Sequence, residues 1–141
     1  MIAVDTNILI YAHRAESRLH ASALARMRAL AEGDVAWGLP VFVLGEFVRV
    51  VTHPRLFAPA TSHKDAFAFL DHLMESPAAR FLLPGPAFAS YLRAACEAAD
   101  ATGNLVFDAQ IAAVCQENGV AELLTADRDF TRFRGIRPVF L

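Results

Sequence analysis

Cysteine is scarce in this sequence, with only Cys96 and Cys115 among 141 residues. The two lie far apart, in segments of helical character and without Cys-x-x-Cys spacing, which favours reduced thiols over a disulfide or a zinc site. Lysine is scarcer still, because Lys64 is the one lysine among 13 basic residues. The net charge of −2 argues against a protein that binds nucleic acid through a broad positive face.

Long hydrophobic runs and targeting signals are also missing. Charged residues or proline interrupt every apolar stretch before the ~18 residues that a membrane-spanning helix needs. The first residues lack the basic region and cleavage site of a signal peptide, so we expect a cytoplasmic protein with no membrane segment. Hydrophobic residues are abundant, at 55% of the chain with 11 Phe, and they are sufficient to form a hydrophobic core. With no repeat or linker, the chain is expected to form a single domain over residues 1–141.

Apolar runs and turn residues alternate along the chain in a pattern that predicts strands and helices in turn. The expected strands cover residues 2–4, 35–39, 79–83, 121–125 and 137–141, and the expected helices cover 8–12, 18–31, 41–51, 63–75, 85–99 and 106–117. Ser17 and Ser62 are the expected N-caps of the second and fourth helices. This alternation predicts an α/β fold with a parallel central sheet flanked by helices, and ligand sites at the carboxyl ends of strands.

Large apolar residues are expected to form the core. Trp37 and most of the Phe residues belong to this set. In the helix expected over 63–75, Phe67, Leu70 and Met74 fall on one face, which we therefore expect to pack inward.

Four acidic residues stand beside apolar segments, where a charge needs a partner. Asp5 and Asp127 each follow an expected strand, so both would lie at the same edge of the sheet. Glu46 is the only charge between residues 40 and 48, and Asp108 interrupts an apolar run. Two carboxylates about 4 Å apart repel by about 4 kcal/mol at an effective dielectric of about 20. A bound cation would remove that repulsion.

These four acids offer only carboxylate oxygens as metal ligands, with no His or Cys beside them. Such ligands favour magnesium or manganese over zinc. A water on such a metal can attack a phosphodiester while the metal stabilises the leaving oxygen. Each acid also has a simpler explanation. Asp5 could cap a helix, Asp108 could interact with a helix dipole, Glu46 could point to solvent, and Asp127 could form a turn.

In combination, these segments closely resemble the successive motifs of PIN domains. The motifs are VDTNILIYA at 4–12, Glu46, DAQIAA at 108–113 and LTADRDF at 124–130. The resemblance spans nearly the whole chain. It implies a three-layer PIN-like fold, endonucleolytic cleavage of RNA, and a magnesium site built from Asp5, Glu46, Asp108 and Asp127.

Among PIN domains, the chain resembles the small VapC toxins. That resemblance implies a homodimer and a VapB-type antitoxin whose C-terminal segment occupies the active-site groove. It also implies supporting roles for Asn7 and Thr125, which match polar positions that orient ligands or water, and for Asp129 as an acid outside the metal ligands. Two departures leave substrate preference open: Phe107 stands where many relatives carry a smaller or polar residue, and no Ser or Thr precedes Glu46.

Several basic residues near the motif ends are candidate RNA contacts, with ordinary surface roles as the alternative. They are Arg14, Arg49, His53, Arg55 and Arg128. None of the five histidines has metal-ligand spacing, and we assign them no catalysis.

Three other functions compete with an RNA nuclease. One is a non-catalytic PIN-like binding module that regulates through an antitoxin partner, and another is a PIN nuclease that acts on DNA. The third is a phosphatase with an aspartate nucleophile. That class carries Asp-x-Asp, whereas this chain has Asn7 at the second position, which cannot serve as an acid.

Overall fold

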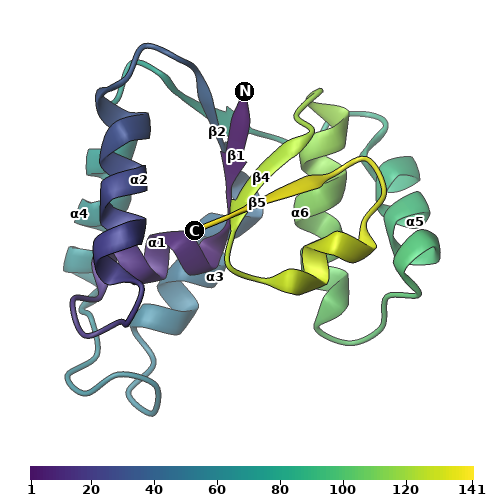
Figure 1. Ribbon diagram of the computed structural model, residues 1–141. Coiled ribbons are helices and arrows are strands. Elements are labelled where there is room, and N and C mark those ends of the chain that lie inside the picture. The colour runs from purple at the N-terminus through teal and green to yellow at the C-terminus, as the bar shows by residue number, and fades with distance from the viewer.

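The computed structural model describes residues 1–141 and contains a five-stranded parallel sheet between two groups of helices (Figure 1). The strands are β1 (Ile2–Val4), β2 (Trp37–Pro40), β3 (Ala79–Leu82), β4 (Glu122–Thr125) and β5 (Arg137–Phe140). The helices are α1 (Thr6–His13), α2 (His20–Glu32), α3 (Val41–Val51), α4 (His63–Met74), α5 (Phe88–Ala99), α6 (Leu105–Glu117) and the short 3-10 helix η1 (Arg128–Arg132). Helices α1 to α4 lie to one side of the sheet, and α5 and α6 lie to the other. The predicted three-layer α/β fold is confirmed.

The strand order β3-β2-β1-β4-β5 places β1 at the centre of the sheet. In the register of β1 and β4, Val4 is paired with Leu124, so both strands end at the same edge. The backbone N–H of Asp5 donates to the carbonyl of Leu124 at 3.0 Å and extends this pairing by one residue. The pairing of β1 with β4 therefore places Asp5 next to Thr125, although the two residues are distant in sequence.

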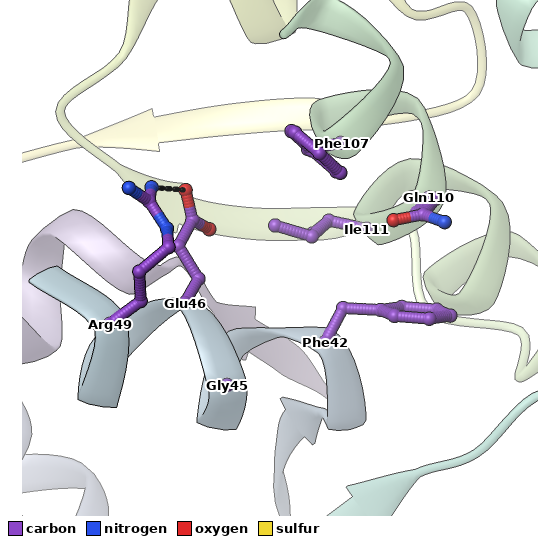
Figure 2. A pocket seen from close by; sticks show the side chains of 7 residues that line it. All are labelled: Phe42, Gly45, Glu46, Arg49, Phe107, Gln110 and Ile111. Carbon is purple, nitrogen blue, oxygen red and sulfur yellow. Dashed lines mark ion pairs between the residues drawn. The ribbon is translucent and has the colours of Figure 1, made fainter.

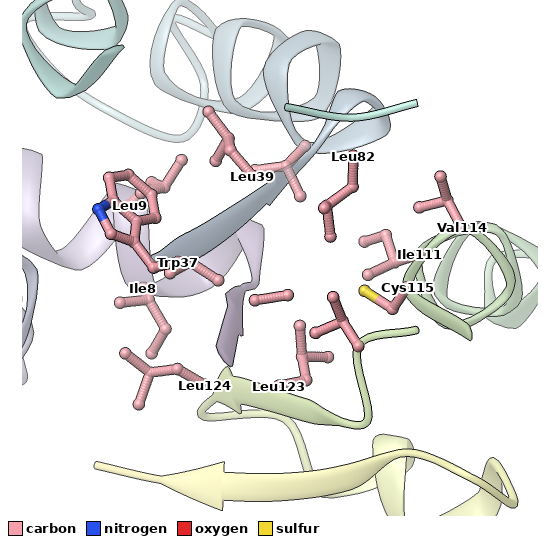
Figure 3. Close-up of a cluster of buried hydrophobic side chains, with 14 of the residues drawn as sticks. Ile8, Leu9, Trp37, Leu39, Leu82, Ile111, Val114, Cys115, Leu123 and Leu124 are labelled. Carbon is pink, nitrogen blue, oxygen red and sulfur yellow. The ribbon is translucent and has the colours of Figure 1, made fainter. Parts of the chain in front are cut away.

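The core forms on both faces of the central strands (Figure 3). Trp37, Leu39, Leu123 and Leu124 are fully buried, because strands covered on both faces have no solvent side. Cys115 is buried in this core, and both cysteines are free. None of the helices combines the length and the apolar character that crossing a membrane requires.

Several element boundaries differ from those expected: α1 begins at Thr6 instead of residue 8, and α5 begins at Phe88 instead of residue 85. Helix α2 begins at His20, and its N-cap is Leu19, which makes no side-chain capping hydrogen bond. The prediction of Ser17 as the cap was wrong, because two consecutive turns, closed by the N–H groups of Ser17 and His20, separate the helices. Strand β2 begins two residues later than expected, and Val35 is exposed, since pairing with β1 and β3 starts at Trp37. The Ser62 cap is confirmed, as its Oγ accepts the N–H of Asp65 at 3.1 Å.

Helix α4 packs inward through two of the three predicted residues, since Leu70 is buried and Met74 is partly buried against the core, but not through Phe67. Its buried residues are Ala66, Leu70 and Leu73, whereas Phe67 is 53% exposed. Phe67 lies one residue beyond Ala66, and a step of one residue rotates a side chain away from the buried stripe of a helix. Three further Phe residues are exposed instead of buried, namely Phe81, Phe107 and Phe140.

Candidate active site

Asp5 is held in one orientation at the carboxyl end of β1. Its Oδ1 accepts the backbone N–H of Thr6 at 2.7 Å, which caps α1. Its Oδ2 accepts hydrogen bonds from Asn7 Nδ2 at 2.7 Å and from Thr125 Oγ1 at 2.6 Å. The side chain is only 4% exposed. Capping is thus one of its roles, but a carboxylate has about four lone-pair positions, and three donors leave one for a further ligand.

Asn7 and Thr125 join β1 and β4 around this carboxylate. Besides donating to Asp5, Asn7 accepts the N–H of Ala126 through its Oδ1 at 3.1 Å. Thr125 is fully buried, and its Oγ1 accepts the N–H of Asp127 at 2.9 Å. One hydroxyl therefore fixes both the position of Asp5 and the start of the loop that carries Asp127.

Glu46 reaches the same region from α3. Its Oε2 accepts a hydrogen bond from the Thr6 hydroxyl at 2.6 Å, and its Oε1 lies 3.9 Å from Arg49 Nη2. This side chain is only partly exposed and faces the end of β1 instead of open solvent. Thr6 is a site residue that the sequence reasoning missed. Only its place inside the motif at 4–12 hinted at a role, because its partner is 40 residues away.

Three aspartates from the last third of the chain gather beside these groups. Asp108 lies in the first turn of α6, and Asp127 lies in the loop after β4. Carboxylate oxygens of Asp108, Asp127 and Asp129 all lie within 4.8 Å of one another. Asp127 does form a turn, since its Oδ1 accepts the N–H of Asp129 at 2.8 Å, and that turn brings Asp129 next to the other acids.

The five acids share one electrostatic environment. Burial raises the pKa of Asp5 to about 7, against the hydrogen bonds from Thr125 and Thr6, and the charges of Glu46 and Asp127 raise it further. Burial also raises the pKa of Asp108 to about 7, and the acids Asp5, Asp127, Glu46 and Asp129 add to this shift in that order. Burial and nearby negative charges thus both oppose the ionisation of these two carboxyl groups.

This donor set fits a hard divalent cation. The clustered atoms are all carboxylate oxygens, with neither His nor Cys among them. Such ligands suit magnesium or manganese, and a cation would favour the ionised forms of Asp5 and Asp108, whose pKa values are raised by burial and, to a smaller extent, by the neighbouring acids. Of the four predicted ligands, Asp108 and Asp127 lie in this cluster together with Asp129, which was predicted as a supporting acid; Asp5 and Glu46 lie outside the cluster but near enough to raise the pKa of Asp108.

Four of the five acids, all except Asp5, line a cleft of about 500 Å³ between α3, α6 and the loop after β4. Its lining residues are Glu46, Arg49, Asn104, Leu105, Phe107, Asp108, Asp127 and Asp129. Of the five basic residues considered as substrate contacts, only Arg49 belongs to this lining.

Arg14 has a structural role instead of the predicted role in substrate contact. Its side chain is only 12% exposed and is paired with Glu16. It donates to Thr61 Oγ1 at 3.1 Å and to the carbonyl of Pro59 at 3.0 Å, and its guanidinium lies 4.5 Å from the centre of the Phe57 ring. These contacts hold the loop between α3 and α4 against the end of α1, and they use the donors that an RNA phosphate would need.

The family model described as "PIN domain" matches residues 2–136 of this chain. Ribonuclease VapC43 from Mycobacterium tuberculosis is 44% identical over 137 residues, covering 97% of this chain and 92% of that protein. Ribonuclease VapC25 from the same species is 33% identical, covering 99% of this chain and 97% of that protein.

Solved structures share the fold. VapBC2 from Rickettsia felis, bound to a DNA fragment from its promoter, gives a TM-score of 0.71 at 18% identity and covers 100% of this chain and 99% of that chain. VapC20 from Mycobacterium tuberculosis, a toxin that cleaves the sarcin-ricin loop, gives a TM-score of 0.70 at 22% identity and covers 98% of this chain and 100% of that chain.

Proposed function

The chain belongs to the PIN domain family, and we propose that it is a metal-dependent endoribonuclease that acts as the toxin of a toxin–antitoxin pair. One observation carries the proposal: acids from α6 and the loop after β4 lie within 4.8 Å of one another, and Asp5 and Glu46 lie near enough for their charges to raise the pKa of Asp108. Relatives named as VapC ribonucleases supply the reaction class.

The proposed ligands of magnesium or manganese are Asp5, Glu46, Asp108 and Asp127. When bound, a divalent cation supplies an acidified water and positive charge for the leaving oxygen of a phosphodiester. The chain contributes the positions of the ligands. Asn7 and Thr125 orient Asp5, and Thr6 orients Glu46, so that these carboxylates do not have to rearrange when the cation arrives.

Asp129 has a supporting role in this proposal. It is exposed, and the turn formed by Asp127 fixes its backbone. From that position it adds negative charge next to Asp108, which raises the affinity of the site for a cation. Arg49, at the other side of the cleft, is placed to contact a phosphate of the RNA.

We further propose that residues 1–141 act as one PIN domain, as a homodimer in the cytoplasm, with a VapB-type antitoxin as inhibitor. The support for the antitoxin comes from the similar structures, several of which are VapBC complexes. The support for the single domain is that the family model spans residues 2–136. Copurification with a VapB-type antitoxin tests the proposed partner, and the mass of the purified protein in solution tests the homodimer.

The decisive experiment is cleavage of total cellular RNA by the purified protein with magnesium and with EDTA. Asp108→Asn removes one proposed ligand, and Asp71→Asn, at an exposed position of α4, is the matched control. We expect discrete fragments from the wild type and from Asp71→Asn in magnesium only, and none from Asp108→Asn. Cleavage of DNA but not RNA would favour the DNA nuclease, and no cleavage of either would favour the non-catalytic binding module.

A further inference from the structure

A second, smaller pocket opens next to the acidic cleft, between α3 and α6 (Figure 2). Its walls come from Phe42, Gly45, Glu46, Arg49, Phe107, Gln110 and Ile111, and its volume is about 250 Å³. Glu46, Arg49 and Phe107 line both spaces, so the pocket and the cleft adjoin each other. Ligand pockets for drug-sized molecules span roughly 300–1,000 Å³, which makes this space suitable for one small planar group.

Phe107 gives the pocket an aromatic wall that is free to make contacts. Its side chain is 57% exposed, although it directly precedes the metal ligand Asp108 in α6. Phe42 lies on the opposite side of the pocket, and its ring is stacked on Phe88 with centroids 5.5 Å apart. The Phe42 wall is therefore fixed by packing, whereas Phe107 has an unused ring face.

Two polar side chains, Gln110 and Arg49, line the pocket besides Glu46. The carboxamide of Gln110 lies between Phe107 and Phe42 and takes part in none of the side-chain hydrogen bonds within the protein. It therefore offers two donors and one acceptor to a ligand. The exposed guanidinium of Arg49 makes only a long, 3.9 Å contact with Glu46, and can turn to a phosphate between the pocket and the acids.

We propose that this pocket holds one unpaired base of the RNA, next to the phosphate that is cut, with the base stacked on Phe107 and its edge hydrogen-bonded to Gln110. Proteins recognise single-stranded RNA by this combination of aromatic stacking and edge hydrogen bonds. The inference rests on the proposed function, because the acids define where the cut phosphate lies. According to this inference, pocket residues on α3 and α6 determine which base is preferred beside the cut, and the proposed metal ligands determine where the cut is made.

Gly45 provides a test that leaves the walls intact. A Cβ built at this position meets no atom within 4 Å, so a larger side chain would enter the pocket without disturbing the packing. We expect Gly45→Leu to fill the space and to keep or raise the stability of α3, since glycine is a poor helix former. Weaker RNA binding together with unchanged or higher thermal stability would be the signature of a blocked pocket.

Binding is measured with a short single-stranded oligoribonucleotide that carries one 2-aminopurine, whose fluorescence falls when the base stacks. The proteins are the wild type, Phe107→Ala, Phe107→Trp, Gly45→Leu and, as the matched control, Phe67→Ala, which removes an equally exposed Phe from α4. We expect quenching with the wild type, Phe107→Trp and Phe67→Ala. Loss of stacking should weaken binding by about 5- to 150-fold in Phe107→Ala.

Cleavage mapping in magnesium gives the second readout. Gln110→Leu and Phe107→Ala should raise KM and relax the base preference beside the cut, with a smaller change in kcat, while Phe67→Ala leaves the fragment pattern unchanged. A pattern and a quench that are the same in Phe107→Ala and Phe67→Ala would overturn the inference and favour an apolar side chain of a protein partner as the occupant. Quenching does not require cleavage, so it can fail or succeed independently of the nuclease proposal.

Discussion

Removal of divalent metal should make the stability of this protein fall as the pH rises. Asp5 has a pKa of about 7 in the folded protein and 3.8 as an isolated group. Between these values the folded state keeps a proton that the unfolded state has lost, so the free energy of unfolding decreases from about pH 4 to about pH 7 and stays low above it. At 1.36 kcal/mol for each pKa unit, the loss from Asp5 is at most about 4 kcal/mol. The pKa of Asp108 is also raised, so its contribution to the free energy of unfolding falls over the same pH range.

His13 acts in the opposite sense and must be separated from Asp5. Burial, followed by the charge of Arg14, lowers the pKa of His13 below 6.5. The unfolded state therefore binds this proton more tightly, and the His13 contribution makes stability rise as the pH approaches 6.5. Asp5→Asn keeps His13 and imitates the protonated form of Asp5. The difference between the wild type and this variant therefore cancels His13 and reports Asp5 together with the part of the Asp108 pKa shift that the Asp5 charge causes.

The assay is urea unfolding in EDTA at pH 5, 6, 7 and 8 for the wild type and Asp5→Asn. We expect the wild type to lose stability relative to Asp5→Asn across this range by about 3 kcal/mol, because about two pKa units lie between pH 5 and the folded pKa of Asp5. Magnesium or manganese at pH 8 should restore the wild type and have a much smaller effect on the variant. Equal pH profiles for the two proteins would refute the reasoning, because Asp5 would then be ionised at little cost in the folded state.

Two further predictions concern the residues around this carboxylate and the loop before α4. Thr125→Val removes the donor to Asp5 and the acceptor for the Asp127 N–H, so it should destabilise the protein by about 1–3 kcal/mol in thermal unfolding and lower cleavage, whereas Thr125→Ser keeps both. Arg14→Met keeps the apolar stem but loses the contacts to Pro59 and Thr61, so residues 53–61 should exchange amide hydrogen faster while cleavage persists. Unchanged exchange would contradict the structural role of Arg14.

Periodicity and the positions of acids were sufficient to predict the sheet, its flanking helices and the edge where the site lies. Asp5 and Asp127 were placed correctly because parallel strands of alternating β and α segments end on one side. These predictions rest on local sequence patterns and on one rule of sheet topology. They remain correct even where the exact ends of elements differ from those expected, as at α2 and β2.

The features that were missed depend on contacts between distant segments. Thr6 meets Glu46, and Arg14 meets the loop at 53–61, only after α1, α3 and that loop have packed together. The orientation of Phe67 depends on which stripe of α4 faces β3 and α3, and several faces of this apolar helix would satisfy the sequence pattern equally well. Pairwise packing of this kind leaves no trace in hydrophobic periodicity.

The hydrogen bond between Thr125 and Asp5 also has a consequence for how the protein is made. Its two residues are 120 positions apart, and β1 is the first strand to leave the ribosome while β4 is the fourth. A growing chain can therefore carry Asp5, Glu46 and Asp108 and still lack the partner that fixes the central carboxylate. The acids can therefore be held in their final arrangement only when synthesis is nearly finished.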